Sequence, residues 1–130
     1  MKRRGFTVIE LLVIIVILSV GGWLFFTERA TINAEQRDST RKTAINAMYY
    51  NLEEVFYELN NYYPQSIDSK TLRAMDATLF TDPTGVKLGD SSSSYRYEAS
   101  GCSTDGQCKA YSLRSSMERE ADYVKTNRIK

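Results

Sequence analysis

The pattern of apolar and polar positions begins with a long apolar stretch. Residues 6–26 form a run of 21 residues with a single charged side chain, Glu10, and they follow the basic run Lys2-Arg3-Arg4. A helix of this length is about 31 Å long, close to the thickness of a bilayer's hydrocarbon core. A carboxylate there costs at least about 3 kcal/mol, so it indicates a function. We therefore expect a membrane-spanning helix in which Glu10 has a role.

An ordinary single-span anchor with a basic flank is one interpretation of this segment. A secretory signal fits less well, because the apolar run is about twice the usual length and no small-residue cleavage site follows it. Gly5 is the small residue in a suitable setting, and it precedes the apolar run. Cleavage after Gly5 would remove the basic residues and keep the anchor.

The pattern then predicts that the same helix continues beyond the membrane. Residues 27–43 are mainly polar, and apolar residues afterwards recur every three or four positions, the spacing of one helical face. This stripe consists of Ile45, Met48, Leu52, Val55, Phe56 and Leu59. Three glutamates are expected to lie mostly off it: Glu53, Glu54 and Glu58. Pro64 disfavours helix in the preceding residue, so we predict one helix over residues 6–61.

The rest of the chain predicts a small head over residues 62–130. Residues 95–99 and 110–113 alternate like half-buried strands, and an antiparallel sheet of such strands would pack on the stripe of the helix. The expected fold class is therefore α+β, with a long N-terminal helix packed against a small antiparallel sheet. Several of the tyrosines should pack beneath this sheet with their hydroxyls at its rim, although they could also form a sticky surface.

The connecting segments of the head carry their own local signals. Asp82-Pro83-Thr84-Gly85 predicts a turn, since proline presets its second position. A short helix is expected over residues 66–75, capped by Ser66 or Ser69. The run of four serines at residues 91–94 predicts a flexible loop.

Cys102 and Cys108 lie between the two predicted strands and enclose five residues. If the head lies outside the membrane in an oxidising compartment, a disulfide is expected. Closing a loop this small is worth about 2 kcal/mol in the chain-entropy model. The spacing does not match paired-cysteine zinc motifs, and there is no second pair of cysteines. Metal and redox roles are the alternatives that we do not favour.

Composition argues against most enzyme classes. The chain has no histidine, which excludes histidine-based triads, histidine general bases and most zinc-hydrolase ligand sets. We expect no enzyme activity, no cofactor and no metal. Acidic loop residues could bind calcium, but they lack regular ligand spacing and are expected to be solvated turn residues. They are Asp82, Asp90 and Asp105.

The segment Arg4-Gly5-Phe6-Thr7-Val8-Ile9-Glu10-Leu11-Leu12 resembles the processing and assembly motif of type IV prepilins and pseudopilins. The resemblance implies that a membrane peptidase cuts after Gly5 and methylates the new N-terminus at Phe6. It also implies that Glu10 is needed for assembly. The expected parts are a leader over residues 1–5, a hydrophobic anchor and filament core over 6–26, and the head.

The chain departs from the family pattern further along the anchor. Many members carry a proline near the end of the apolar run, where this chain has Gly21-Gly22. A glycine pair costs about 2 kcal/mol of helix propensity, so it could be the point where the helix loosens or bends. Close packing between membrane helices is the alternative interpretation of the same pair.

Cleavage would also give Glu10 a partner. It creates an ammonium group on Phe6, about one helical turn from Glu10, and opposite charges in apolar surroundings are better paired than separate. A pair formed between neighbouring chains would set their axial register, whereas a pair within one chain would not. The sequence leaves both possibilities open.

We therefore expect a structural subunit of a type IV pilus-like filament. It would span the prokaryotic cytoplasmic membrane before assembly and lie in an extracellular pilus or on the cell surface afterwards. Its expected partners are copies of itself, the prepilin peptidase and methylase, the membrane, and the assembly platform and motor. The alternatives are a pseudopilin of a secretion or DNA-uptake apparatus and a non-polymerising anchored surface protein. The basic tail at residues 125–130 could touch DNA, although a disordered terminus is expected.

Overall fold

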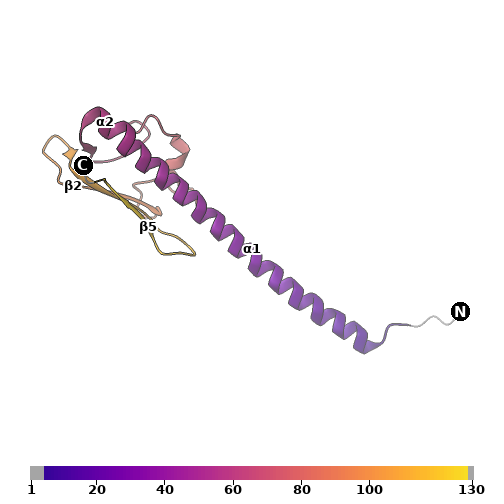
Figure 1. Ribbon diagram of the computed structural model, residues 1–130. Helices are drawn as coiled ribbons and strands as arrows, with labels where there is room; N and C mark the ends of the chain where they lie inside the picture. Colours follow the sequence, from indigo (N-terminus) through magenta and orange to yellow (C-terminus); the bar gives the residue numbers. More distant parts are fainter. Residues whose placement is uncertain (1–4, 129–130) are drawn as a thin grey trace. The chain divides into compact units, whose positions relative to one another are not determined.

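The computed structural model describes residues 5–128 and shows one long helix and a set of short strands (Figure 1). Most of the expected leader, residues 1–4, and the last two residues of the basic tail lie outside the described residues. The chain divides into two compact units, Met1–Ala34 and Glu35–Lys130. Each unit is described by itself.

The first unit is the N-terminal part of helix α1, which extends over Val8–Tyr50. Its apolar side chains are exposed, and Trp23 exposes 75% of its surface. By its length and apolar composition, this helix could cross a membrane. The helix passes through Gly21 and Gly22 without a break, and a Cβ at either position would meet nothing within 4 Å. Helix flexibility at this pair stays a prediction.

A π-helical segment, Asn51–Phe56, and a last α-helical turn, α2 at Tyr57–Asn60, follow α1 directly. The helix ends because Asn61 adopts a left-handed conformation with φ of 60°, and its N–H donates to the carbonyl oxygen of Tyr57 at 2.7 Å. The observed end, Asn60, is one residue before the predicted end. Pro64 lies further on, in strand β1.

The π-helical segment changes which residues face the core. Ile45, Met48 and Leu52 are buried as predicted, but the expected continuation of the stripe fails at Leu59, which exposes 77% of its surface. Glu53, expected off the stripe, is instead fully buried. A π-helix has more residues per turn than an α-helix, so it rotates the side chains that follow it around the axis. The placement of the glutamate off the stripe was therefore wrong.

The second unit contains the predicted antiparallel sheet. Strands β2 (Tyr95–Ser100), β4 (Ala110–Ser115) and β5 (Tyr123–Thr126) form a three-stranded sheet in the order β2-β4-β5. Tyr97 pairs with Leu113, and Arg114 pairs with Val124. This arrangement confirms the α+β fold class and the two predicted strands.

The head also contains a second, two-stranded sheet. Strand β1 (Tyr63–Pro64) follows the helix and pairs with β3 (Gln107–Cys108) in antiparallel register. The core between helix and sheets is made of buried apolar and aromatic side chains. It includes Ala44, Ile45, Met48, Leu52, Tyr63, Ile67, Leu72, Phe80, Tyr95, Tyr111 and Leu113.

The predicted short helix over residues 66–75 is absent. The carboxylate of Asp68 accepts hydrogen bonds from the N–H groups of Lys70 and Thr71. The segment forms two short turns, in which the Leu72 N–H donates to the Asp68 carbonyl and the Met75 N–H donates to the Leu72 carbonyl. Such local side-chain bonds compete with helix. A short 3₁₀ helix forms next, over Ala77–Phe80, where the side chain of Asp76 accepts from the Thr78 N–H.

Two segments that were expected to be flexible are ordered. In the serine run, Ser93 is buried and its hydroxyl accepts from the Tyr95 N–H, while Ser94 donates to Asp82. In the basic tail, Lys125 lies in β5 and Arg128 forms an ion pair with Glu54. The expectation was therefore wrong for the serine run and for residues 125–128 of the tail, where Ser94 and Arg128 bind partners distant in sequence.

Candidate functional site

The N-terminal segment starts helix α1 with a threonine cap. The Thr7 hydroxyl oxygen accepts a hydrogen bond from the Glu10 N–H at 3.4 Å, and its carbonyl oxygen accepts from the Leu11 N–H at 3.1 Å. Threonine at this position satisfies one of the free N–H groups at a helix start. The order Thr-x-x-Glu is also that of a capping box, which places Glu10 in the first turn.

Four residues line an open hollow of about 450 Å³ at this helix start: Gly5, Phe6, Thr7 and Glu10. The structure therefore brings the predicted cleavage residues and the predicted assembly residue around one surface. Phe6 exposes 75% of its surface, and Glu10 is exposed as well. Within residues 5–128, no cationic side chain lies within ion-pair distance of the Glu10 carboxylate. Both side chains are thus open to a partner.

The predicted pair of cysteines lies elsewhere, in the head. Cys102 and Cys108 form a disulfide with an S–S distance of 2.01 Å. Cys108 belongs to β3 and is buried, whereas Cys102 follows β2 and is exposed. The disulfide therefore closes the loop that pairs with β1 just after the helix ends.

A buried carboxylate that the sequence did not indicate connects four parts of the head. One oxygen of Glu53 accepts hydrogen bonds from the hydroxyls of Tyr63 at 3.0 Å and Tyr111 at 2.9 Å, and from the Arg128 N–H at 3.3 Å. Burial raises the pKa of both tyrosines, and the hydrogen bond to Glu53 and its charge raise it further. These two hydroxyls lie in the core, so the expectation of hydroxyls at the rim was wrong for them.

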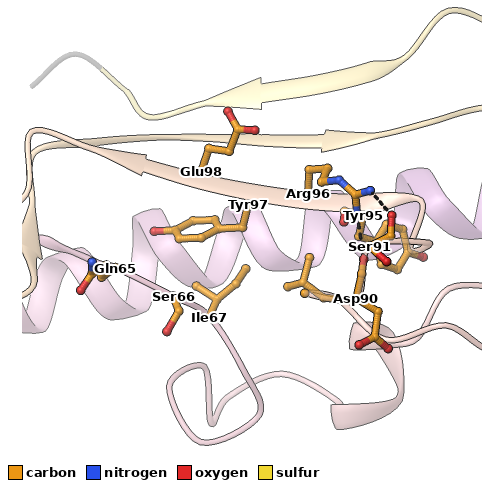
Figure 2. Close-up of a pocket in the computed structure, with 11 residues that line it drawn as sticks. Gln65, Ser66, Ile67, Asp90, Ser91, Tyr95, Arg96, Tyr97 and Glu98 are labelled. Carbon is orange, nitrogen blue, oxygen red and sulfur yellow. Dashed lines mark hydrogen bonds between the residues drawn. The ribbon is translucent and has the colours of Figure 1, made fainter.

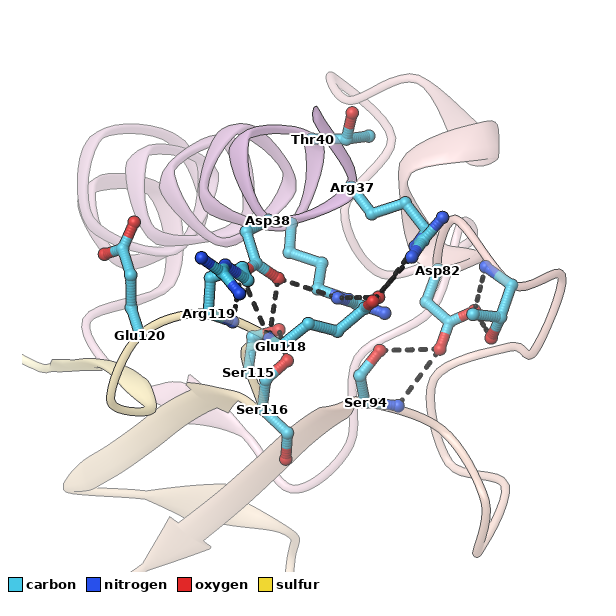
Figure 3. A network of polar contacts seen from close by, with 12 residues as sticks. Arg37, Asp38, Thr40, Asp82, Ser94, Ser115, Ser116, Glu118, Arg119 and Glu120 are labelled. Atoms are coloured by element: carbon cyan, nitrogen blue, oxygen red, sulfur yellow. Dashed lines mark hydrogen bonds and ion pairs between the residues drawn. The ribbon is translucent and has the colours of Figure 1, made fainter. Parts of the chain in front are cut away.

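A second polar cluster joins α1 to the loop before β5 (Figure 3). The Asp38 carboxylate is buried and accepts from the N–H groups of Glu118 and Arg119 at 2.9–3.0 Å. The Arg41 guanidinium donates to both Asp38 and Glu118 at 2.8 Å, and Arg37 pairs with Glu118 at 2.6 Å. The sequence signal was an acid and a base three residues apart, at Asp38 and Arg41.

This cluster holds its acids in the charged form. Hydrogen bonds from Arg37 and then Arg41 lower the pKa of Glu118 to about 2. For Asp38, burial raises the pKa, but the bonds from the N–H groups of Glu118 and Arg119, together with the bond and charge of Arg41, outweigh it and leave the pKa below its usual value. The cluster joins the helix to the loop through hydrogen bonds and ion pairs.

Asp82 organises the turn that it begins. Its carboxylate is buried and accepts five hydrogen bonds, from both the N–H and hydroxyl groups of Thr84 and Ser94 and from the Val86 N–H. Figure 3 shows the two bonds from Ser94. Burial opposes its ionisation, yet the bonds from Ser94 and Thr84 leave the pKa well below its usual range. Asp82 is therefore not a solvated turn aspartate. Asp90 and Asp105 are exposed, as expected.

A hollow of about 410 Å³ borders strand β2 (Figure 2). Arg96 lies at one end, where its guanidinium donates to the carbonyl oxygens of Asp90, Ser91, Ser93 and Tyr95 at 2.6–3.1 Å. These bonds use the guanidinium to order the neighbouring loop. In the described part of the chain, no group of three or more acidic or cysteine side chains is placed to hold a metal ion.

The family model for the prokaryotic N-terminal methylation motif matches residues 1–26. No curated protein sequence and no solved structure matches the chain. The match covers the predicted cleavage residues, Gly5 and Phe6, together with Glu10 and the apolar part of α1.

Proposed function

We propose that this chain is a type IV pilin-like protein and a structural subunit of a pilus-type filament, because it carries the N-terminal methylation motif of pilins and pseudopilins. The observation that carries the proposal is the position of the motif at the start of an exposed apolar helix. The motif belongs to structural subunits rather than to enzymes.

The apolar part of α1 fits insertion in the membrane before assembly. A prepilin peptidase would then remove residues 1–5 and methylate Phe6. In the filament, the exposed apolar side chains of α1 would contact those of neighbouring subunits instead of lipid. Lipid tails are as apolar as these side chains, so packing rather than a new hydrophobic gain would hold the core together. Extraction from the membrane would require the assembly platform and its motor.

Glu10 would act once the leader has been removed. Before cleavage the nitrogen of Phe6 is an uncharged amide, and afterwards it is an ammonium group that can pair with a carboxylate. The exposed positions of Phe6 and Glu10 around one hollow support this proposal. A pair between chains would set the axial register of adjacent helices, and the heads would lie on the outside of the filament.

The first experiment is to determine the N-terminal residue of the mature protein by mass spectrometry. We expect methylated Phe6 in the native chain and an uncut, membrane-bound precursor in Gly5→Leu. Normal processing of Gly5→Leu would contradict cleavage after Gly5.

The second experiment tests assembly with Glu10→Ala. This variant should be processed normally but should give at least about tenfold fewer sheared filaments, because its mature N-terminus has no carboxylate partner. Thr7→Val is the comparison variant, since it removes the capping hydroxyl and keeps the charge. Wild-type filament yield from Glu10→Ala would show that the charge is dispensable.

A pseudopilin of a secretion or DNA-uptake apparatus remains the second candidate, because the same motif serves both classes. Imaging of extracellular fibres with identification of their main protein separates the two. Absence of this chain from surface fibres would favour the pseudopilin. Arg128 forms an ion pair with Glu54, and Lys125 lies over the rings of Tyr49 and Tyr123. These contacts within the head occupy both cations, so the described residues of the basic tail do not support DNA binding.

A further inference from the structure

An apolar groove lies on the head beside the end of the long helix. It has a volume of about 230 Å³ and lies between the helix and the turn that precedes the 3₁₀ helix. Its apolar lining comes from Val55, Phe56, Leu59, Leu72 and Ala74. Leu59 exposes 77% of its surface. The groove is thus open to solvent and lined mainly by apolar side chains, so it can receive an apolar side chain of another molecule.

The rim of this groove carries a cation. Arg73 lines the groove, and its Nε donates to the carbonyl oxygen of Lys70 at 3.1 Å. Within residues 5–128, no carboxylate lies within ion-pair distance of Arg73, so its other N–H groups can bind a partner. The groove is therefore complementary to an apolar side chain with a carboxylate close beside it.

The N-terminal unit carries a surface of this composition outside the apolar anchor. Glu28 and Ile32 are four residues apart in α1, so their side chains lie on the same face of the helix. Ile32 exposes 58% of its surface, and Glu28 is exposed. In the described part of the chain the Glu28 carboxylate has no ion pair. The volume of the groove suits one or two side chains rather than a folded domain.

We propose that the groove of one subunit receives Ile32 of a second copy, and that Arg73 pairs with Glu28 of that copy. This inference rests on the proposed filament. Each chain carries both the groove and its ligand, so the contact is heterologous and can repeat from copy to copy. A heterologous contact whose rotation does not close a ring produces an open helical assembly. The contact would thus place the head of one subunit against the helix of another.

Cysteine cross-linking tests the apolar half of the contact. The two native cysteines are joined to each other, so Ile32→Cys together with Ala74→Cys adds the reactive thiols to the chain. Mild oxidation of assembled filaments should give a ladder of linked dimers, trimers and longer species. Asn33→Cys with Ala74→Cys is the matched control, because Asn33 is exposed on a different face of the same turn. A ladder no stronger than that of the control would overturn the proposal, as would cross-links to another protein alone.

A charge exchange tests the polar half. Arg73→Glu and Glu28→Arg should each lower filament yield by about fivefold, the effect of about 1 kcal/mol for one exposed pair. The double variant should return to within about twofold of wild type. Thermal unfolding of each variant, followed by the tyrosine signal of the head, shows whether it folds. Wild-type filaments with neither the ladder nor the rescue would overturn this contact alone, whereas absence of wild-type filaments would overturn the proposed function as well.

Discussion

At the scale of single residues, buried carboxylates organise the head. Glu53, Asp38 and Asp82 are all buried, and each accepts at least two hydrogen bonds. A buried charge without partners would cost several kcal/mol, so these bonds are what make burial tolerable. Each acid joins segments that are distant in sequence, such as the helix and β4 at Glu53.

Glu53→Ala should destabilise the head by at least about 2 kcal/mol, because it leaves the hydroxyls of Tyr63 and Tyr111 in the core without their acceptor. The measurement is urea unfolding of the full chain in detergent, followed by near-UV circular dichroism of the tyrosines. Glu98→Ala, an exposed acid on β2, should change stability by less than about 0.5 kcal/mol. Equal stability of the two variants would contradict the role assigned to Glu53.

At the scale of elements, the two parts of the long helix differ in what their side chains contact. Its N-terminal part is exposed and apolar, and its C-terminal part supplies one side of the head's core. The π-helical segment at Asn51–Phe56 brings a glutamate into that core, while Leu59 stays outside beside the groove. Local helix geometry therefore determines both a buried polar site and an exposed apolar one.

The glycine pair in α1 can be tested as a property of this element. Gly21→Ala with Gly22→Ala should slow amide hydrogen exchange across residues 18–25 by at least about tenfold in detergent, because each glycine costs about 1 kcal/mol of helix propensity relative to alanine. Ser19→Ala is the control within the same turns and should have a much smaller effect. A Cβ at either glycine meets no atom within 4 Å, so the change introduces no clash. Unchanged exchange would show that the pair does not loosen the helix.

At the scale of the whole molecule, the head depends on ionised acids. Asp38, Asp82 and Glu118 have pKa values below their usual range, and that of Glu118 is about 2. Groups with depressed pKa values stabilise the folded state above their unfolded pKa, near 4, and this contribution is lost as pH falls through the folded value. The free energy of unfolding of the head should therefore be higher at neutral pH than below about pH 4.

We expect the free energy of unfolding to fall steadily between about pH 4 and about pH 2. Asp82→Asn should lower stability at pH 7 and make this acid dependence shallower, because it removes one of the depressed groups. Asp105→Asn, at an exposed position in the cysteine loop, should leave the pH dependence as in wild type. Chemical unfolding at a series of pH values measures both effects, and a wild-type slope in Asp82→Asn would contradict the assignment.

Patterns that act over short distances were predicted well. The apolar run, the alternation of the two strands and the Asp-Pro-Thr-Gly turn each depend on neighbouring residues, and the structure contains all three. The short helix at 66–75 was predicted from a cap at Ser66 or Ser69. In the structure the Asp68 side chain, and not either serine, accepts hydrogen bonds from the N–H groups of Lys70 and Thr71. Strand β5 was missed because its pairing with β4 is a contact between distant segments.

The sequence by itself determined the N-terminal methylation motif, the apolar helix and the α+β class, because motif order and hydropathy period are local properties. It placed Glu10 in the first turn of that helix, whereas the helix begins at Val8 and not at the predicted Phe6. Only the tertiary structure decided that Glu53 and Asp82 are buried and that Leu59 borders an open groove. The physical reason is that burial depends on which distant segments supply hydrogen-bond donors, and on a helical register that a single π-helical segment shifts.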